Sequence, residues 1–141
     1  MKALRLLWVL LFVFVGILSS YAQDDGMATI NLGGNDELGE FLVDANGMTL
    51  YIYTYDPLGE TVCYDRCAEN WPPLLVEGEE VVGDPRLPGE LGTIERTDGT
   101  HQVTYNGWPL YYWNGDEVLG DIAGEGRGDV WYTVSPETLI V

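Results

Sequence analysis

The stretch of sequence that decides the fold occurs twice, as VDANGMTLYIYTYD at positions 43–56 and as VTYNGWPLYYWNGD at positions 103–116. At a fixed offset of sixty residues (103 minus 43) the two share a valine, an Asn-Gly pair, a Leu-Tyr pair and a final aspartate. The same offset pairs further residues without a gap. This many matches at one offset indicate two copies of one unit. The further pairs are Tyr53 with Trp113, Gly39 with Gly99, and Trp71 with Trp131.

Both copies have the sequence of a β-hairpin. The Asn-Gly pairs at 46–47 and 106–107 lie between runs rich in Val, Leu, Tyr and Trp. We expect a type I′ turn at each, because Asn and Gly tolerate the positive φ angles that this turn requires. In residues 50–55, Leu50, Ile52 and Thr54 alternate with tyrosines, and neither face of this strand is strongly polar. Both faces are therefore predicted to contact protein.

The remaining patterns favour further strands and little helix. Turn residues at Asp98-Gly99 predict a hairpin between 91–95 and 101–104, and residues 130–134 read as a closing strand. Pro109 predicts an edge or a bulge. A short helix is expected over 61–70, with Thr61 as its N-cap and its end at Trp71-Pro72-Pro73.

We therefore expect a mainly β, single compact domain of two tandem pseudo-symmetric repeats, with one short helix near the cysteines. Two copies are too few for a solenoid, so the copies should pair and share a core. The residues predicted to fill that core are Val43, Leu50, Trp71, Val103, Leu110 and Trp131.

The N-terminus has the pattern of an export signal. Lys2 and Arg5 precede an apolar run over 6–18, and Ser20-Tyr21-Ala22 supplies small residues for cleavage. The run has 13 residues, too few for a membrane span of about twenty. The predicted organisation is signal peptide 1–22, mobile lead 23–36, repeat one 37–77, connecting loop 78–92 and repeat two 93–136.

The chain is strongly acidic. It has 6 basic and 23 acidic residues and a formal charge of −17. Removal of residues 1–22 would leave 6 − 2 = 4 basic residues against the same 23 acids, which gives 4 − 23 = −19. Such a surface disfavours nucleic acid and anionic membrane, because phosphate contacts need a Lys/Arg patch. Repulsion between like charges also favours a soluble monomer.

The most specific motif is Tyr-x-aromatic-x-x-Asp, at Tyr51-x-Tyr53-x-x-Asp56 and Tyr111-x-Trp113-x-x-Asp116. The two aromatics of each motif share one strand face, and Trp71 and Trp131 follow at matching positions. One interpretation is an aromatic core with the aspartate capping a turn. The other is a ligand pocket floored by aromatic rings, with a carboxylate at its rim.

The chain resembles a family of secreted or lipoprotein repeats named for this motif. The stretches that carry the resemblance are GMTLYIYTYD, CYDRCAENWPPLL, RTDGTHQVTYNGWPLYYWNGD and GDIAGEGRGDVW. The resemblance implies an exported protein with paired repeats, but it supplies no function. Two departures matter: no cysteine follows the apolar run to accept a lipid, and Tyr132 stands where members often have histidine.

Cys63 and Cys67 are expected to form a disulfide, because exported proteins meet an oxidising environment and one helical turn brings the two residues within bridging range. The alternative is thiol redox or copper chemistry, in which two thiolates and His101 or Met48 would bind Cu(I). The second copy has Ala123 and Arg127 at these positions.

The glycine-rich stretch 120–129 contains carboxylates that suggest a weak calcium site. The alternative is a tight loop that needs positive φ at several glycines. His101, the one histidine of the chain, is expected to be inert. The weak metal candidates are Asp116, Asp121, Glu125, Asp129 and His101.

The sequence contains no catalytic constellation, since one histidine occurs without a nucleophile motif. We therefore expect no enzyme activity and no cofactor. The predicted role is an extracytoplasmic, non-catalytic domain that binds an envelope or extracellular ligand or builds surface structure. The alternatives are a redox or copper-handling protein that uses the cysteine pair, and a calcium-dependent envelope protein.

Overall fold

The computed structural model describes residues 29–138, and within them the chain is mainly β, as predicted. The signal peptide predicted at 1–22 lies outside the described residues. The elements are β1 (Thr29–Asn35), β2 (Gly39–Val43), β3 (Tyr51–Tyr53), α1 (Arg66–Asn70), β4 (Leu75–Val76), β5 (Val82–Gly83), β6 (Leu91–Glu95), β7 (His101–Tyr105), β8 (Trp108–Pro109), the 3-10 turn η1 (Arg127–Asp129) and β9 (Trp131–Thr133).

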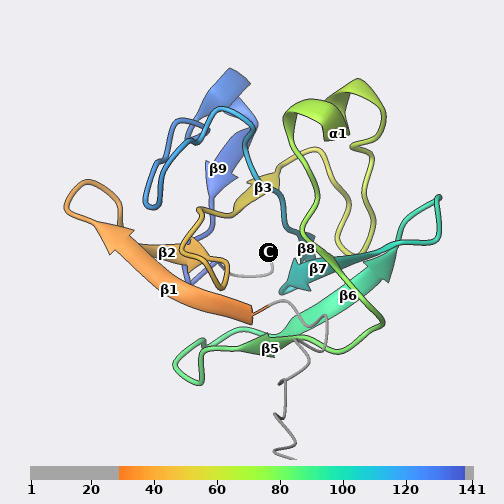
Figure 1. Ribbon diagram of the computed structural model, residues 1–141, viewed down its shortest axis with the longest axis horizontal. Helices are drawn as coiled ribbons and strands as arrows, with labels where there is room; N and C mark the ends of the chain where they lie inside the picture. The colour runs from red at the N-terminus through yellow and green to blue at the C-terminus, as the bar shows by residue number, and fades with distance from the viewer. Residues whose placement is uncertain (1–28, 139–141) are drawn as a thin grey trace, which may run out of the picture.

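The strands form three small sheets (Figure 1), with the orders β2-β1-β5, β4-β7-β6 and β3-β9. β8 pairs with β7 beside the second of these. Two ladders join strands from different copies, since β3 pairs with β9 and β4 pairs with β7. Neither copy is a separate body, and the two repeats interlock through their strands.

The two motif strands meet at their first tyrosines. The amide of Tyr51 donates to the carbonyl of Tyr111 at 2.8 Å, and the amide of Tyr111 donates to the carbonyl of Tyr51 at 2.9 Å. This reciprocal pair is an antiparallel bridge. It relates equivalent residues of the two copies and therefore lies on the pseudo-twofold axis of the domain.

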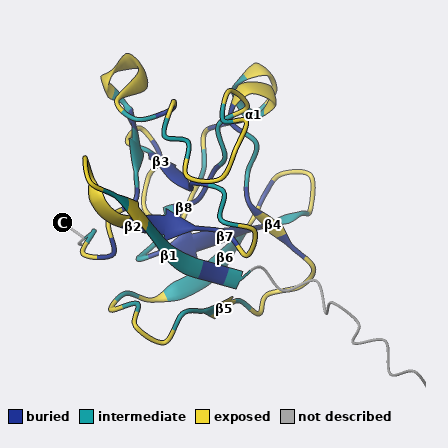
Figure 2. Cartoon of the chain, turned by 60° about the vertical axis from the view of Figure 1, so that its left-hand side comes forward, coloured by how far each residue is buried: buried dark blue, intermediate teal, exposed yellow. Residues whose placement is uncertain are grey.

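The core has two parts, which lie on opposite faces of the motif strand. Leu50 and Ile52 join an aliphatic cluster, and Tyr51 joins an aromatic one. The predicted alternation is therefore confirmed for residues 50–53, and the prediction that both faces contact protein is wrong for Thr54 and Tyr55, which follow the end of β3 and are exposed. All six residues predicted to fill the core are buried. Figure 2 shows the buried residues gathered along the strands, while both helical turns stand exposed at one end.

The two Asn-Gly hairpins differ from each other. Asn106 and Gly107 have φ angles of 50° and 82°, so the type I′ prediction is confirmed there. The prediction is wrong at 46–47, where only Gly47 has a positive φ. The reason is Asp44, whose carboxylate accepts from the amides of Asn46 and Met48 and closes a longer loop.

The predicted helix is shorter than expected and has a different start. α1 begins at Arg66, and Thr61 does not cap it. The Thr61 hydroxyl instead accepts from the amide of Cys63 and bonds the hydroxyl of Tyr111. Asp65, at the helix start, has a positive φ of 51°, which prevents the helix from extending further toward Thr61.

Two segments expected to lack regular structure contain strands. Residues 29–35 of the predicted lead form β1, of which residues 31–35 pair with β2. Ile30 and Leu32 alternate toward the aliphatic cluster, a short apolar alternation that the glycines at 33 and 34 obscure. Residues 82–83 of the connecting loop form β5 and pair in parallel with the start of β1.

The second half of the chain follows the predicted strand pattern. β6 and β7 form a hairpin that turns at Asp98-Gly99, where Gly99 has a φ of 83°. β9 lies within the predicted closing strand at 130–134. Pro109 belongs to the two-residue strand β8, beside the main path of its sheet.

The two hairpin turns give a matched pair of substitutions. Asn106→Ala should lower the free energy of unfolding by about 1–3 kcal/mol, because alanine is strained at positive φ and the side chain bonds the amide of Glu90 and the carbonyl of Thr138. Asn46→Ala should cost less than about 0.5 kcal/mol. Urea unfolding of both variants tests this, and equal losses would contradict it.

Candidate functional site

The motif tyrosines and aspartates bond crosswise between the copies. Tyr51 of the first copy donates from its hydroxyl to Asp116 of the second at 2.7 Å. Tyr111 of the second copy donates to Asp56 of the first at 2.5 Å. A hydrogen bond to a charged group contributes about 1.5–3 kcal/mol. The motif therefore links the two repeats through its own polar atoms.

Each aspartate also closes the loop that follows it. Asp56 accepts from the amide of Val62 at 2.8 Å, and Asp116 accepts from the amide of Ala123 at 2.9 Å. The predicted capping role thus spans six residues in one copy and seven in the other. The carboxylates fix two equivalent loops while they hold the opposite tyrosine.

The tyrosine hydroxyls have a second partner each. Tyr51 accepts from the amide of Gly124 at 3.2 Å, and Tyr111 bonds the Thr61 hydroxyl at 2.6 Å. Gly124 permits this approach because a Cβ there would lie only 2.8 Å from the Tyr51 ring. Both phenols are therefore fully engaged within the domain.

Four motif and tryptophan rings form one continuous stack in the order Tyr53, Trp131, Trp71 and Trp113. The successive centroid distances are 4.2, 3.9 and 4.3 Å. The central indoles, Trp71 and Trp131, are stacked face to face at an interplanar angle of 3°. Tyr51 and Tyr111 meet these indoles edge-on, so the stack follows the same pseudo-symmetry.

Both outer rings of the stack are half-buried and have further neighbours. Tyr55 lies edge-on to Tyr53 at 5.5 Å, and the Arg127 guanidinium lies 4.2 Å from the Trp113 centroid. The structure thus brings the aromatic site candidates together in one cluster. It does not leave the motif rings as the open floor of a pocket, since each of them packs against Trp71 or Trp131.

The two copies close the same turn by different means. Cys63 and Cys67 form a disulfide with a Cα–Cα distance of 5.2 Å, so their sulfur atoms are not thiolate ligands in this state. At the equivalent positions Arg127 donates from its Nε to the carbonyl of Ala123 at 2.9 Å. The disulfide of the first copy therefore corresponds to a hydrogen bond from the Arg127 guanidinium in the second.

Each loop after a motif aspartate packs on the Asn-Gly turn of the other copy. Leu58 lies over Gly107, and the Gly59 amide donates to the Gly107 carbonyl at 2.8 Å. Leu119 lies over Gly47, close enough that an added methyl there would contact it at 3.6 Å. The paired glycines of the two turns therefore serve the contact between copies.

The weak metal candidates do not converge among residues 29–138. Asp121 accepts from the amides of Glu117 and Val118, and Glu125 accepts from the amide of Thr133. Asp129 is exposed within η1, and His101 lies in β7. Within this part of the chain no three His, Cys, Asp or Glu side chains form a group suited to a metal ion.

Burial controls the ionisation of the crosswise pairs. It raises the pKa of Asp56 and of Asp116 above the ordinary value of 3.8, although the tyrosine hydroxyls act in the opposite direction. Burial, and then the hydrogen bond to a carboxylate, raise the pKa of Tyr51 and Tyr111 well above the ordinary range. Both phenols are therefore protonated donors at neutral pH.

One residue of the site escaped sequence reasoning altogether. Arg96 is buried, donates to Gln102 at 2.7 Å and to the carbonyl of Cys63 at 2.8 Å, and lies over the Tyr64 ring. It anchors the disulfide turn to the β6–β7 hairpin. An arginine just before a turn gives no pattern that would reveal this, because its partners are distant in sequence.

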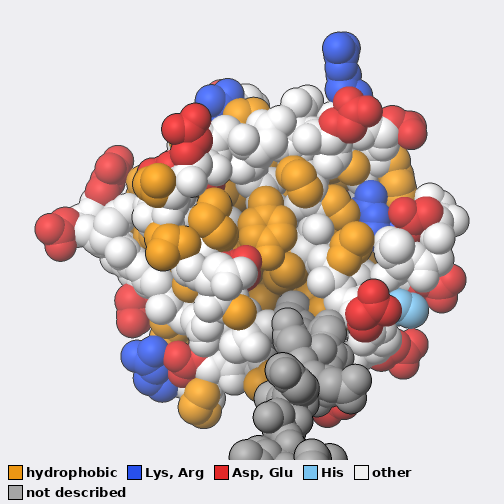
Figure 3. All heavy atoms as spheres, viewed as in Figure 1, with side chains coloured by type: hydrophobic (Ala, Val, Ile, Leu, Met, Phe, Trp, Pro, Cys, Tyr) orange, Lys and Arg blue, Asp and Glu red, His pale blue; other side chains and the backbone are white. Residues whose placement is uncertain are grey.

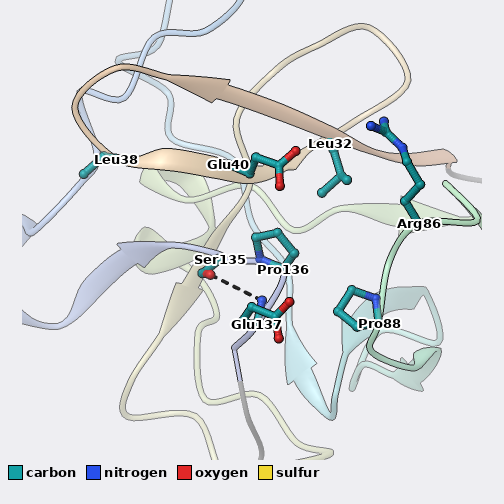
Figure 4. Close-up of a pocket in the computed structure, with 8 residues that line it drawn as sticks. All are labelled: Leu32, Leu38, Glu40, Arg86, Pro88, Ser135, Pro136 and Glu137. Carbon is teal, nitrogen blue, oxygen red and sulfur yellow. Dashed lines mark hydrogen bonds between the residues drawn. The ribbon is translucent and has the colours of Figure 1, made fainter.

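Two surface pockets occupy equivalent places in the copies. The first, of about 350 Å³, includes Ser135, Pro136 and Glu137 beside Glu40 (Figure 4). The second, of about 300 Å³, is lined by residues 75–78 and 99–101. At the sixty-residue offset, positions 135–137 of the first pocket correspond to positions 75–77 of the second, and Glu40 corresponds to Thr100. Four lining positions therefore correspond between the pockets.

One face of the molecule combines apolar and acidic side chains. Figure 3 shows orange apolar side chains in the middle of one face, with red carboxylates around them and few blue side chains. Among residues 29–138, no helix is long and apolar enough to cross a membrane.

Comparison with known proteins identifies the class. A family model described as a secreted repeat of unknown function matches this chain twice, over residues 34–75 and 92–135. The chain belongs to this family of secreted repeats, and the predicted duplication and family resemblance are confirmed. No curated protein and no solved structure matches it.

The crosswise bonds predict strong coupling between Tyr111 and Asp56. Tyr111→Phe should cost about 1–3 kcal/mol of unfolding free energy, because it leaves a buried carboxylate short of a donor. In a double-mutant cycle with Asp56→Asn, the two losses should be non-additive by about 0.5–3 kcal/mol. Tyr112→Phe is the control, because Tyr112 donates to Asp44 instead. An additive cycle for Tyr111 and Asp56 would contradict the crosswise pair.

The raised pKa of Asp56 predicts a pH dependence with a definite sign. As the pH rises above 3.8, the Asp56 carboxyl ionises in the unfolded chain before it ionises in the folded protein. The free energy of unfolding therefore falls as the pH rises. Wild type should therefore lose stability relative to Asp56→Asn as the pH rises from 3.8 towards the raised pKa of folded Asp56. Asp98→Asn serves as the control, because the pKa of exposed Asp98 is lowered and its contribution changes only below that window. Chemical denaturation across this range decides the sign.

Proposed function

We propose that the protein is a non-catalytic extracytoplasmic binding domain that holds a positively charged partner through its two equivalent pockets. The observation that carries this proposal is the crosswise use of the motif. Its tyrosine hydroxyls and aspartate carboxylates bond one another and nearby loop atoms. The repeated motif therefore builds the domain, and surfaces outside it are left for recognition.

The pockets support recognition because the duplication repeats them. Each contains a glutamate at the same place, Glu137 in one and Glu77 in the other. Arg86 at the rim of the first is paired with Asp84 at 2.7 Å, which offsets its charge. A formal charge of −17 over the whole chain disfavours anionic ligands and attracts cationic ones. A monomer would then engage its partner at two points.

Titration of the mature protein with an oligolysine peptide, followed by NMR chemical shifts, tests the proposal. Amides around Glu77 and Glu137 should shift together, and the affinity should fall as salt is added, because exposed charges are screened. An oligoglutamate peptide and a neutral oligosaccharide should cause no shifts at these sites.

Glu77→Gln/Glu137→Gln should weaken oligolysine binding. Glu60→Gln/Glu117→Gln, which removes the same two charges from exposed positions outside both pockets, should not. Shifts centred on Tyr53 and Trp113, or equal losses in all variants, would reject the pockets as the binding surface.

A further inference from the structure

We propose that the four-ring stack is a one-electron relay, which carries an oxidising equivalent from a positively charged oxidant to Tyr51 and Tyr111. Each of these tyrosines would release its phenolic proton to the aspartate of the other copy. This inference does not depend on the binding proposal, since it uses the interior of the domain and not the pockets.

The stack has the geometry of an electron path. Indole and phenol rings are the aromatic side chains that give up one electron most readily, and transfer between them requires close contact of their π systems. The rings of Trp71 and Trp131 lie 3.9 Å apart and nearly parallel. Both are only 6% exposed, so a radical cation on either indole is shielded from water. The outer rings extend the path on either side to half-buried positions.

The crosswise pairs supply the proton acceptors that the path needs. A phenol loses an electron easily only when its proton leaves at the same time. Tyr111 lies edge-on to Trp131 at 5.1 Å and already donates to Asp56. Tyr51 lies edge-on to Trp71 at 5.4 Å and donates to Asp116. The burial that raises the pKa of both carboxyls makes them better proton acceptors.

The proposed step balances in electrons and protons. The oxidant takes one electron from an indole of the stack and is reduced, and the indole becomes a radical cation. An electron from Tyr111 refills the indole while the Tyr111 proton moves from Oη to Asp56 Oδ2. The products are a neutral tyrosyl radical, a protonated Asp56 and the restored indole. A one-electron reductant and return of the proton reverse the step.

Charge selects the oxidant and the end at which it acts. The acidic chain attracts a cationic one-electron oxidant. Arg127 over Trp113 repels such a cation and also makes that ring harder to oxidise. The opposite end carries Tyr53 and Tyr55, and the Tyr55 side chain is 68% exposed. The oxidant should therefore act at the Tyr53 end.

Flash photolysis with tris(bipyridine)ruthenium, oxidised to its Ru(III) cation by a sacrificial acceptor, tests the relay. All variants carry Tyr53→Phe/Tyr55→Phe, so that the two phenols at the oxidant end form no tyrosyl radical of their own, while position 53 keeps a ring against Trp131. Transient absorption should show a tryptophan radical that decays as a tyrosyl radical rises, and electron paramagnetic resonance should confirm the tyrosyl product.

Tyr51→Phe/Tyr111→Phe should abolish that tyrosyl signal and prolong the tryptophan radical, and Asp56→Asn/Asp116→Asn should do the same with both phenols present. Trp71→Phe should lower the tyrosyl yield, whereas Trp108→Phe, which removes an indole outside the stack, should not.

An unchanged tyrosyl yield in the double tyrosine variant overturns the proposal, as does an equal effect of Trp71→Phe and Trp108→Phe. Circular dichroism tests whether each variant is folded. If Trp71→Phe is not, the tyrosine and aspartate variants decide the question.

Discussion

The pairing of Tyr51 with Tyr111 at the pseudo-twofold axis, with each hydroxyl bonded to the other copy, is the constraint on which the rest of the domain depends. The backbone bridge between these residues fixes the register of the two motif strands. With the register fixed, each phenol donates to the aspartate of the opposite copy. Those aspartates in turn set the paths of the two following loops. One short contact therefore propagates into the stack, the loops and the hairpin turns.

The departures from symmetry are concentrated away from this axis. The first copy closes its turn with a disulfide and the second with Arg127. A disulfide over so small a loop contributes only about 2 kcal/mol in the chain-entropy picture, so a charged hydrogen bond together with stacking on Trp113 is a comparable substitute. Similarly, Asp44 lengthens one hairpin turn while Asn106 allows the tighter one. The contacts on the axis are common to both copies, so these differences off the axis leave the pairing of the copies intact.

The sequence predicted features whose causes are local or repeated. Duplication, the alternation along residues 50–53, the turn at 106–107 and the six core residues all follow from periodicity, turn chemistry or the fixed offset. Prediction from the sequence failed where the local structure depends on a side chain that is distant in sequence. Thr61 was expected to cap a helix, but the Tyr111 hydroxyl fifty residues away bonds it. β1 was missed because its apolar alternation is short and glycine interrupts it. The crosswise pairing itself follows from neither copy alone.

The motif has a physical explanation that joins its structural and chemical sides. An aspartate buried to 4% exposure is costly unless donors satisfy it, and the opposite tyrosine is such a donor. A tyrosine held against a carboxylate must have its ring fixed, and the edge-on indole fixes it. The indoles then stack because the twofold axis places them face to face. Offset or edge-on aromatic pairs contribute about 0.5–1.5 kcal/mol each beyond area burial. The arrangement that stabilises the interface between copies therefore also places proton donors, proton acceptors and π systems in one dry cluster. The proposed electron relay therefore needs no groups beyond those that already hold the two copies together.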